Sequence, residues 1–323
     1  MTSLALPNAA PDVARITVIL GTGGTIAGTA ASAQDSVGYR AAQLGVAALV
    51  AAVPALQGLA LEAEQVAQID SKDMSAAVWQ ALARRAAAHL ARPEVGGVVV
   101  THGTDTLEET AYFLHRVLAP TKPLVLTAAM RPATALLADG PQNLFDAVML
   151  ARQRDACGVM AVLAGEVFAA TALRKCHTFR LDAFEAGDAG LLAAVEHGVL
   201  RRFREAPAAV ALGLQTIAAA PDAWPRVEIV LNHAGADGRL VDALVAQGLQ
   251  GLVLAGTGNG SLSASLEAAA LRAQAAGVRV LRASRCAHGA LLGDGSPLPG
   301  AGALSAVQAR IELLLQGLLA RPG

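Results

Sequence analysis

Aromatic residues are scarce in this sequence of 323 residues, with two tryptophans, two tyrosines and six phenylalanines making up 3% of it. Charged residues are also few, at 16%, whereas hydrophobic residues reach 54%. Disordered segments are usually rich in charge and poor in hydrophobic residues. The composition therefore excludes disorder for most of the chain and predicts a core of alanine, valine and leucine.

The sequence contains 25 basic and 26 acidic residues, so neither sign of charge is in clear excess. It has no cluster of Lys and Arg that could bind a phosphate backbone or an anionic membrane. We therefore expect no nucleic-acid and no membrane partner. The three cysteines, Cys157, Cys176 and Cys286, lack the CxxC spacing typical of zinc or redox sites. They indicate reduced thiols, and we expect neither a metal nor another cofactor.

Long apolar runs are almost absent. The stretch from 41 to 61 has no charge, but it is mostly alanine and contains a proline and two glutamines, so we do not expect it to span a membrane. Near the N-terminus, Asp12 and Arg15 interrupt the region where a signal peptide needs an unbroken apolar stretch. These observations favour a cytoplasmic protein.

The length exceeds the roughly 250 to 300 residues at which a single core usually stops growing. Short apolar runs ending in glycine or threonine alternate with alanine-rich stretches of helical period, which is typical of parallel strands joined by helices. We predict a doubly wound α/β fold: a larger, mainly parallel N-terminal domain over 1–200, a proline-containing linker over 201–224, and a smaller C-terminal α/β domain over 225–323.

Several well-known motifs fail. The turn that begins Gly21-Thr22-Gly23 has Ile26 where a dinucleotide fingerprint needs its third glycine, and Thr29 stands where a phosphate-binding loop needs lysine. Neither a GxSxG elbow nor an HExxH helix occurs. Phosphate binding, serine-hydrolase chemistry and zinc-protease chemistry therefore have no support.

Three apolar runs end in similar small loops that carry hydroxyl groups. These loops are GTGGT at 21–25, THGTD at 101–105 and GTGNG at 256–260. In open parallel sheets, ligands bind beyond the carboxyl ends of the strands, where such loops converge. We expect the first two loops to form the walls of one site.

A helix is predicted to begin just after Thr106, because Thr106 and Glu109 have capping-box spacing ahead of an apolar pattern of helical period. Thr104 and Asp105 then lie where free backbone N–H groups can hold an amide oxygen as it becomes an oxyanion. Alternatively, these two residues merely cap the helix, and the hydroxyl of Thr22 likewise satisfies local backbone groups.

Long motifs occur in one order along the whole chain: TGGTIAG at 22–28, SKDM at 71–74, HGTDTLEETAYFL at 102–114, AMRP at 129–132, ADGPQNL at 138–144, AGTGNGS at 255–261 and SRCAHG at 284–289. With these motifs the chain resembles the bacterial type II-like L-asparaginases of the asparaginase/glutaminase family. The resemblance implies an amidohydrolase that converts L-asparagine and water to L-aspartate and ammonia, with a side activity on glutamine.

The resemblance also implies the catalytic residues. Thr22 would attack the amide carbon and form an acyl-enzyme, although attack by a directed water stays open. A threonine hydroxyl is a weak nucleophile that needs a neighbouring base. Tyr39 would belong to a lid that closes over the substrate, and Lys175 would act with Asp105 on the hydroxyl of Thr104 or on a water.

The same resemblance implies the substrate contacts. Ser71 would bind the α-carboxylate, Asp105 the α-amino group, and the backbone around Thr104 and Ala129 the amide. Lys72 stands where the family often has glutamine. Its charge either assists carboxylate binding or points to solvent.

A neighbouring subunit completes the family's sites, so the resemblance implies a homotetramer built as a dimer of dimers. Ser261 matches the polar residue that the neighbour supplies, and serine instead of asparagine hints at a roomier pocket for glutamine. The neighbour's glutamate is missing, because Ser296 occupies its place. Asp294, two residues earlier, is a candidate replacement.

His102 lies two residues before Thr104 on a turn, a spacing that favours a structural histidine over a general base. Two alternatives to an asparaginase stay open. One is an amidase or amidotransferase-related enzyme acting on another amide. The other is an amino-acid-binding protein with weakened catalysis, suggested by Lys72 and the missing glutamate.

Overall fold

The computed structural model describes residues 15–35, 37–196, 198–293 and 295–320. The chain divides into two compact units. The N-terminal unit comprises the residues up to Ala186 together with 190–211, and the C-terminal unit comprises 187–189 and the residues from Leu212 onward. Asp294 lies outside the described residues.

The N-terminal unit is built on an eight-stranded sheet in the order β10-β9-β6-β5-β4-β3-β1-β2. Its strands are β1 (Ile16–Gly23), β2 (Leu61–Ile69), β3 (Val95–Thr101), β4 (Pro123–Thr127), β5 (Gly158–Leu163), β6 (Glu166–Ala169), β9 (Ala193–Glu196) and β10 (Val199–Arg202). The pairs from β2 through β5 are parallel, and those from β5 through β10 are antiparallel. The predicted mainly parallel sheet is confirmed.

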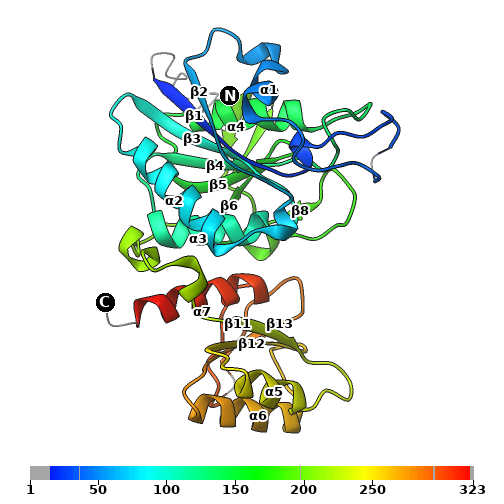
Figure 1. Ribbon diagram of the computed structural model, residues 1–323, viewed down its shortest axis with the longest axis vertical. Coiled ribbons are helices and arrows are strands. Elements are labelled where there is room, and N and C mark those ends of the chain that lie inside the picture. Colours follow the sequence, from blue (N-terminus) through cyan, green and yellow to red (C-terminus); the bar gives the residue numbers. More distant parts are fainter. Residues whose placement is uncertain (1–14, 36, 197, 294, 321–323) are drawn as a thin grey trace, which may run out of the picture. The chain divides into compact units, whose positions relative to one another are not determined.

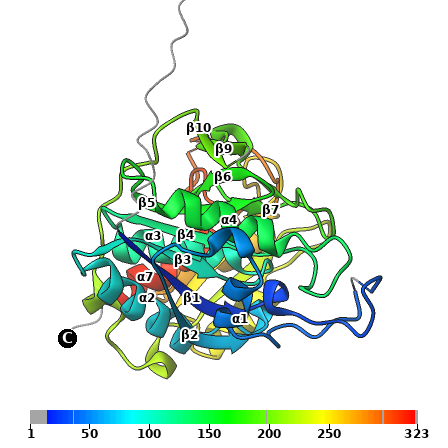
Figure 2. The ribbon, with the colours of Figure 1, turned by 90° about the horizontal axis from the view of Figure 1, so that it is seen from above.

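Helices cover both faces of this sheet, as a doubly wound fold requires (Figure 1). They are α1 (Val46–Ala51), α2 (Ala76–Leu90), α3 (Leu107–Leu118) and α4 (Gly140–Ala151). In the view from above, α1 and α4 lie over the strands (Figure 2), while α2 and α3 pack on the opposite face (Figure 1).

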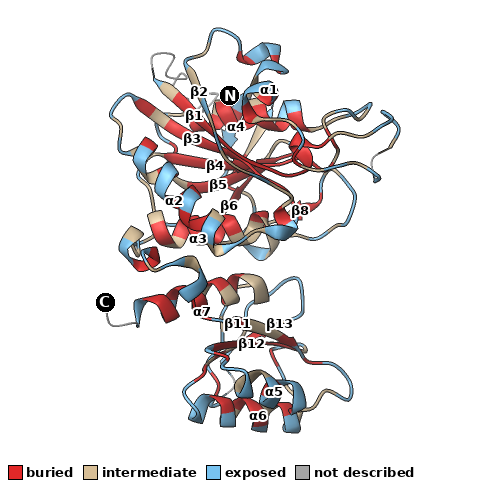
Figure 3. Cartoon of the chain, viewed as in Figure 1, coloured by how far each residue is buried: buried red, intermediate tan, exposed pale blue. Residues whose placement is uncertain are grey.

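The central strands are buried along nearly their whole length (Figure 3). On the face covered by α4, Ile19, Val99 and Val125 pack in one core cluster with Leu144 and Val148. These aliphatic side chains supply the core that the low aromatic content predicts. Because a strand buried on both faces has no solvent-facing positions, its sequence is continuously apolar rather than alternating.

The antiparallel half of the sheet departs from the strand–helix alternation. Strands β5 and β6 are joined by a two-residue hairpin in which Ala164 (φ 50°) and Gly165 (φ 77°) both adopt positive φ. Hairpins with positive φ at both turn positions favour Asn-Gly or Asp-Gly. Alanine at the first position gives no such signal, so the sequence did not reveal this turn.

The uncharged stretch from 41 to 61 contains α1, a 3-10 turn at Pro54–Leu56 and the first residue of β2. Each piece is short. Within the part of the chain that the structure describes, we find no helix with the length and apolar character needed to cross a bilayer.

The C-terminal unit has a parallel three-stranded sheet in the order β11-β12-β13. Its elements are β11 (Val227–Leu231), α5 (Arg239–Ala246), β12 (Gly251–Gly256), α6 (Ala264–Ala275), β13 (Arg279–Ser284) and α7 (Ala306–Leu319). The division between the units falls between residues 211 and 212. The stretch from 201 to 224 begins with the last two residues of β10 and contains 3-10 turns at Leu214–Ile217 and Pro221–Ala223.

Candidate active site

Three loops meet at the carboxyl ends of β1, β2 and β3. Gly24, with φ 79°, lies so close to Gly103 that a Cβ on Gly24 would overlap the Gly103 backbone. A Cβ on Gly103 would in turn overlap Oγ of Ser71. Because only glycine permits this approach, the motifs at 22–28, 71–74 and 102–114 come together in one place.

Thr22 lies at the end of β1 and is 2% exposed. Its Oγ1 donates a hydrogen bond to the carbonyl oxygen of Thr101 at 3.0 Å. In this conformation the hydroxyl proton is therefore directed to the backbone of β3. Thr22 has to rotate or find another acceptor before its oxygen can attack a carbon.

Tyr39 contacts a residue that the sequence reasoning missed. Its hydroxyl lies 2.6 Å from Oγ1 of Thr25, which is also buried. None of the described hydrogen bonds joins Tyr39 directly to Thr22. The second threonine of the TGGT motif was the available signal, because it places another hydroxyl three residues after Thr22.

Thr104, Asp105 and Lys175 are brought into contact. Lys175 belongs to β7 (Arg174–Lys175), which pairs with β8 (Phe184–Glu185). Its Nζ donates to Oγ1 of Thr104 at 2.9 Å and to Oδ1 of Asp105 at 2.6 Å. The side-chain nitrogen is thus held by a strand and donates one hydrogen bond to a buried hydroxyl and another to a carboxylate. A lysine that contacts a hydroxyl can activate it once the lysine loses a proton.

Ser71 is held beside Asp105. It is 2% exposed, and its Oγ accepts a hydrogen bond from the backbone N–H of Asp105 at 3.2 Å. The hydroxyl of Thr106 donates to the carbonyl oxygen of Ser71 at 2.8 Å. Helix α3 begins after Thr106 as predicted, but the Thr106 side chain makes no capping bond. The capping-box prediction was wrong because this hydroxyl binds Ser71 instead.

Lys72 has a local partner. Its Nζ lies 2.8 Å from Oδ2 of Asp70, and its side chain is 65% exposed. The hydrogen bond that Lys72 donates to Asp70 and the negative charge of Asp70 raise the pKa of Lys72, so the ammonium stays charged. Of the two alternatives for Lys72, this geometry favours the solvent-facing one.

His102 is a structural residue. Burial lowers its pKa to about 4, so the ring is neutral near pH 7. Its Nδ1 lies 2.7 Å from the Gly103 carbonyl and therefore carries the proton, which leaves Nε2 to accept from Thr110 Oγ1 at 3.0 Å. The indole of Trp79 donates to the same hydroxyl at 2.9 Å. This series of hydrogen bonds orients the Gly103 peptide, which lies against Gly24 and Ser71.

Ala129 is fully buried in the loop after β4. The carboxylate of Asp139 accepts hydrogen bonds from the backbone of Met130 at 2.9 Å and Arg131 at 3.0 Å. Asn143 donates to Asp139 Oδ2 at 3.2 Å and to the carbonyl of Ala128 at 2.9 Å. The ADGPQNL motif therefore holds the AMRP loop in place. The motif is visible in the sequence, but its pattern alone predicts no role for its residues.

Ser261 belongs to the C-terminal unit, in the loop after β12. Its backbone pairs with Thr257 through hydrogen bonds of 2.8 and 3.0 Å, and Asn232 donates to its carbonyl at 3.2 Å. The loop is therefore well fixed while the residue stays exposed. Ser296 accepts a hydrogen bond from the N–H of Leu298 at 3.3 Å.

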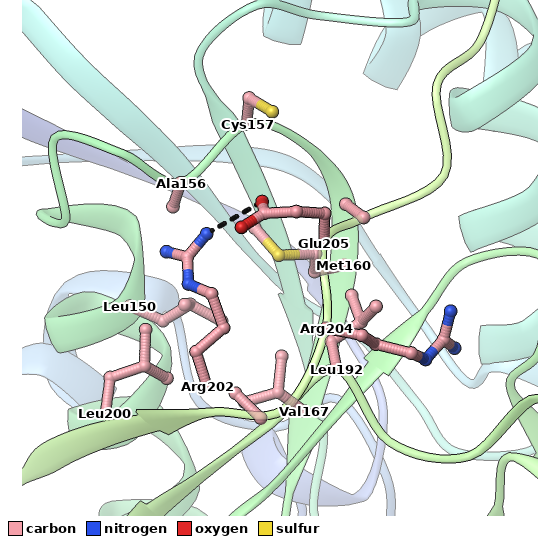
Figure 4. A pocket seen from close by; sticks show the side chains of 12 residues that line it. Leu150, Ala156, Cys157, Met160, Val167, Leu192, Leu200, Arg202, Arg204 and Glu205 are labelled. Carbon is pink, nitrogen blue, oxygen red and sulfur yellow. Dashed lines mark hydrogen bonds and ion pairs between the residues drawn. The ribbon is translucent and has the colours of Figure 1, made fainter. Parts of the chain in front are cut away.

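A small cavity of about 20 Å³ lies elsewhere in the N-terminal unit (Figure 4). Apolar side chains such as Leu150, Met160 and Leu200 line it, and Arg202 pairs with Glu205 at 3.1 Å beside it. None of the candidate residues borders this space, which is partly open to solvent beside the exposed Cys157.

No group of three or more His, Cys, Asp or Glu side chains is arranged to hold a metal ion among the described residues. The chemistry available around Thr22 and Thr104 is that of hydroxyl groups next to a lysine and a carboxylate. Such groups at the carboxyl ends of parallel strands are typical of enzymes that attack carbonyl carbons.

Comparison with known proteins defines the family. The model of the N-terminal asparaginase domain matches residues 16–208, and that of the glutaminase/asparaginase C-terminal domain matches residues 226–319. The chain belongs to the asparaginase/glutaminase family of hydrolases.

Individual relatives agree with this assignment. L-asparaginase 2 of Bacillus subtilis (strain 168) is 37% identical over 274 residues, which cover 84% of this chain and 73% of the relative. A glutaminase-asparaginase of Pseudomonas fluorescens biotype A is 39% identical over 275 residues, or 83% and 74% of the two chains. The crystal structure of a probable cytoplasmic L-asparaginase from Campylobacter jejuni matches with a TM-score of 0.89 at 35% identity, covering 95% and 96%.

Proposed function

We propose that this protein hydrolyses L-asparagine to L-aspartate and ammonia and acts on L-glutamine as a second substrate. The observation that carries the proposal is the contact of Lys175 with Thr104 and Asp105, in a family whose relatives include asparaginases and glutaminase-asparaginases. A protein that only binds amino acids needs no such group beside a buried threonine.

In this mechanism, Oγ1 of Thr22 attacks the side-chain amide carbon. The Thr22 proton leaves its bond to the Thr101 carbonyl and passes to a neighbouring base, with the Tyr39–Thr25 pair as the candidate path. The tetrahedral oxyanion is stabilised by backbone N–H groups around Thr104 and Ala129. Its collapse breaks the C–N bond, and the departing nitrogen takes up a proton and leaves as ammonia.

Water then completes the reaction. The intermediate is an ester between Thr22 and the substrate acyl group. A water attacks the ester carbon, and its proton returns to the threonine oxygen as the C–O bond breaks. Thr104 is suited to orient this water, and Lys175, once it has given up a proton, is suited to accept the water's proton and pass it towards the threonine oxygen, since the lysine Nζ and the Thr104 hydroxyl lie 2.9 Å apart.

Substrate recognition divides between two side chains. The hydroxyl of Ser71 binds the α-carboxylate. Asp105 receives Lys175 on Oδ1 and keeps Oδ2 for the α-ammonium group. Its side chain is 54% exposed, which leaves this oxygen accessible. In this arrangement Lys72 adds only a solvent-screened positive charge, because it pairs with Asp70.

The decisive experiment measures ammonia release from L-asparagine and L-glutamine by the purified protein and by Thr22→Ala. Turnover that disappears in a folded variant supports the proposal. An active Thr22→Ala protein would exclude Thr22 as the nucleophile. If neither protein turns over asparagine, a ligand-induced rise in Tm would indicate a binding protein, and activity on other amides would indicate a different amidase.

We further propose a homotetramer in which the C-terminal domain supplies Ser261 to a neighbouring subunit's site. Coexpression of Thr22→Ala with Ser261→Arg tests this arrangement. In a tetramer of either variant alone, every site has one of the two residues replaced. In a mixed tetramer, some sites combine the wild-type Thr22 of one subunit with the wild-type Ser261 of its neighbour. Recovered activity supports shared sites, and a mixture that stays inactive contradicts them. Sedimentation velocity measures the oligomer size.

For location we propose the cytoplasm. The three cysteines, Cys157, Cys176 and Cys286, are free and exposed, and reduced thiols are usual in that compartment. Fractionation of the producing cells tests this, and recovery of the protein from the periplasmic fraction would contradict it.

A further inference from the structure

Residues 28–35 and 37–40 form the segment that we call the lid, because it carries Tyr39, which the family resemblance places in a lid. It begins at Gly28, the last residue of the TGGTIAG motif. Its two ends are paired, since the backbone groups of Thr29 and Arg40 exchange two hydrogen bonds of 2.9 Å. The Tyr39 ring packs against Gly28, where an added Cβ would lie 2.9 Å from ring atom Cδ2. The position of Tyr39 is therefore coupled to the position of the whole lid.

A second loop, residues 132–138, runs alongside the lid (Figure 2). Two backbone hydrogen bonds of 2.9 Å join them, from Ala133 N–H to the Gly28 carbonyl and from Leu136 N–H to the Ala33 carbonyl. Between these bonds, the N–H of Ala30 donates to the hydroxyl of Thr134 at 2.8 Å. Thr134 is thus the side chain through which this loop holds the lid.

The second loop is itself anchored. Arg131 precedes the loop and Asp139 follows it. Asp139 is the N-cap of α4, and its carboxylate accepts a hydrogen bond from the N–H of Arg131. The same carboxylate fixes the turn that contains Ala129. Residues 132–138 therefore connect two parts of the site. One is the backbone near Ala129, which is proposed to hold the substrate amide, and the other is the lid that carries Tyr39.

We propose that Thr134 is a positioning residue: its hydroxyl holds the lid against residues 132–138 and so keeps the Tyr39 hydroxyl on Thr25. Without this hydrogen bond the lid opens more often, although the two backbone bonds remain. Because water can replace the lost partner at this exposed site, the net effect of one such bond is modest. We expect the open population to rise about two- to tenfold.

Two variants separate the hydroxyl from the size of the side chain. Thr134→Val keeps the shape and removes the hydroxyl, whereas Thr134→Ser keeps the hydroxyl. Ser32→Ala is the matched control, because the Ser32 hydroxyl contacts only Gln34 within the lid in the hydrogen bonds described. Thr134→Ala serves as the test variant if valine prevents folding.

The first readout is native-state trypsin cleavage after Arg40, an exposed residue at the base of the lid, with the cut identified by mass spectrometry. When opening and closing are fast, the cleavage rate follows the open population. We expect Thr134→Val to be cut about two- to tenfold faster than the wild type, with Thr134→Ser and Ser32→Ala unchanged. Equal cleavage of Thr134→Val and wild type would overturn the proposal.

The second readout rests on the proposed function. Thr134→Val should lower kcat/KM for L-asparagine by a smaller factor than the rise in cleavage, because only the molecules with an open lid lose activity, and Thr134→Ser should restore it. Faster cleavage with unaltered kcat/KM would overturn the catalytic part of the inference. Cleavage by trypsin requires no turnover of substrate. An inactive wild-type protein would therefore refute the proposed function, but the cleavage rates would still test whether Thr134 holds the lid.

Discussion

The loops after β1 and β3 look alike in sequence, yet the protein surrounds their threonines differently. Thr104 contacts Lys175, which a strand holds in place, and lies next to Asp105. Thr22 has a backbone carbonyl as its described partner, and the hydroxyl of Tyr39 reaches only the neighbouring Thr25. The β3 loop therefore already has its candidate groups in contact, whereas the candidate partner of Thr22, Tyr39, is bonded to Thr25 in the described structure.

This contrast suggests a division of labour. A preorganised group costs no rearrangement when charge develops, which suits the stabilisation of the oxyanion and of the attacking water. A nucleophile whose proton is bonded to the backbone stays unreactive until a substrate arrives and the lid is in place. Thr22 would then become reactive only in a site that holds substrate, although the candidate groups of the β3 loop are already in contact.

The largest effect should come from removing Lys175, because its contact with Thr104 distinguishes the β3 loop from the β1 loop. Lys175→Met deletes the group that contacts Thr104 and is expected to lower kcat about 10²- to 10⁴-fold, the range of a general base. Steady-state ammonia release measures this. Near-wild-type kcat would show that the two loops are equivalent and that Lys175 only stabilises Asp105.

Asp105→Asn should have the next largest effect, and it should act on binding as well as rate. One carboxylate is proposed to bind the substrate ammonium and to pair with Lys175, so the variant should raise KM about tenfold and also lower kcat. Titration of L-asparagine separates the two parameters. A KM equal to that of the wild type contradicts the binding role.

A third test concerns His102 in the β3 loop and the dependence of the free energy of unfolding on pH. Burial lowers the folded-state pKa of His102 to about 4, below the usual histidine pKa of about 6.5. Protons therefore bind preferentially to the unfolded chain, and the free energy of unfolding should fall as the pH drops from 6.5 towards 4. His102 should account for about 2 kcal/mol of this loss by pH 5.

Urea unfolding of the wild type and His102→Gln at pH 7 and pH 5 measures this contribution. The variant should be less stable at pH 7, because it breaks the chain from Trp79 to Gly103, but it should lose less stability on acidification. Parallel losses in both proteins would mean that His102 does not titrate in this range.

The smallest effect is expected for Lys72→Gln. Because Lys72 is exposed and paired with Asp70, its loss should change KM for asparagine by no more than about threefold, as for an exposed ion pair. KM measured at low and high salt checks this. A tenfold rise in KM that disappears at high salt would instead place the Lys72 charge in substrate binding.

Local patterns predicted much of the fold. The continuous apolar runs before Gly21, Thr101 and Gly256 became parallel strands, and α3 begins after Thr106. Such patterns are informative because a strand buried on both faces has to be apolar throughout. The β5–β6 hairpin escaped prediction because its Ala164-Gly165 turn lacks the usual residues.

The candidate site was predictable as a set of residues but not as a set of contacts. The family resemblance names Thr22, Tyr39, Thr104 and Lys175 as candidates, although only Thr22 and Thr104 lie within the long motifs. They do not show that Tyr39 pairs with Thr25, or that Asp139 holds the backbone of the AMRP loop. Each of these bonds depends on the path of a loop, and loop paths leave little trace in local sequence.

The amino-acid sequence by itself determined the family, the buried strands and the small hydroxyl-bearing loops that follow them, because apolar periodicity and glycine-rich turns act over a few residues. Only the tertiary structure decided which hydroxyl meets which partner. Lys175 reaches Thr104 across 71 positions of sequence, and Thr134 reaches Ala30 across 104. Such contacts exist only once the packed sheet has brought its loops together at one edge.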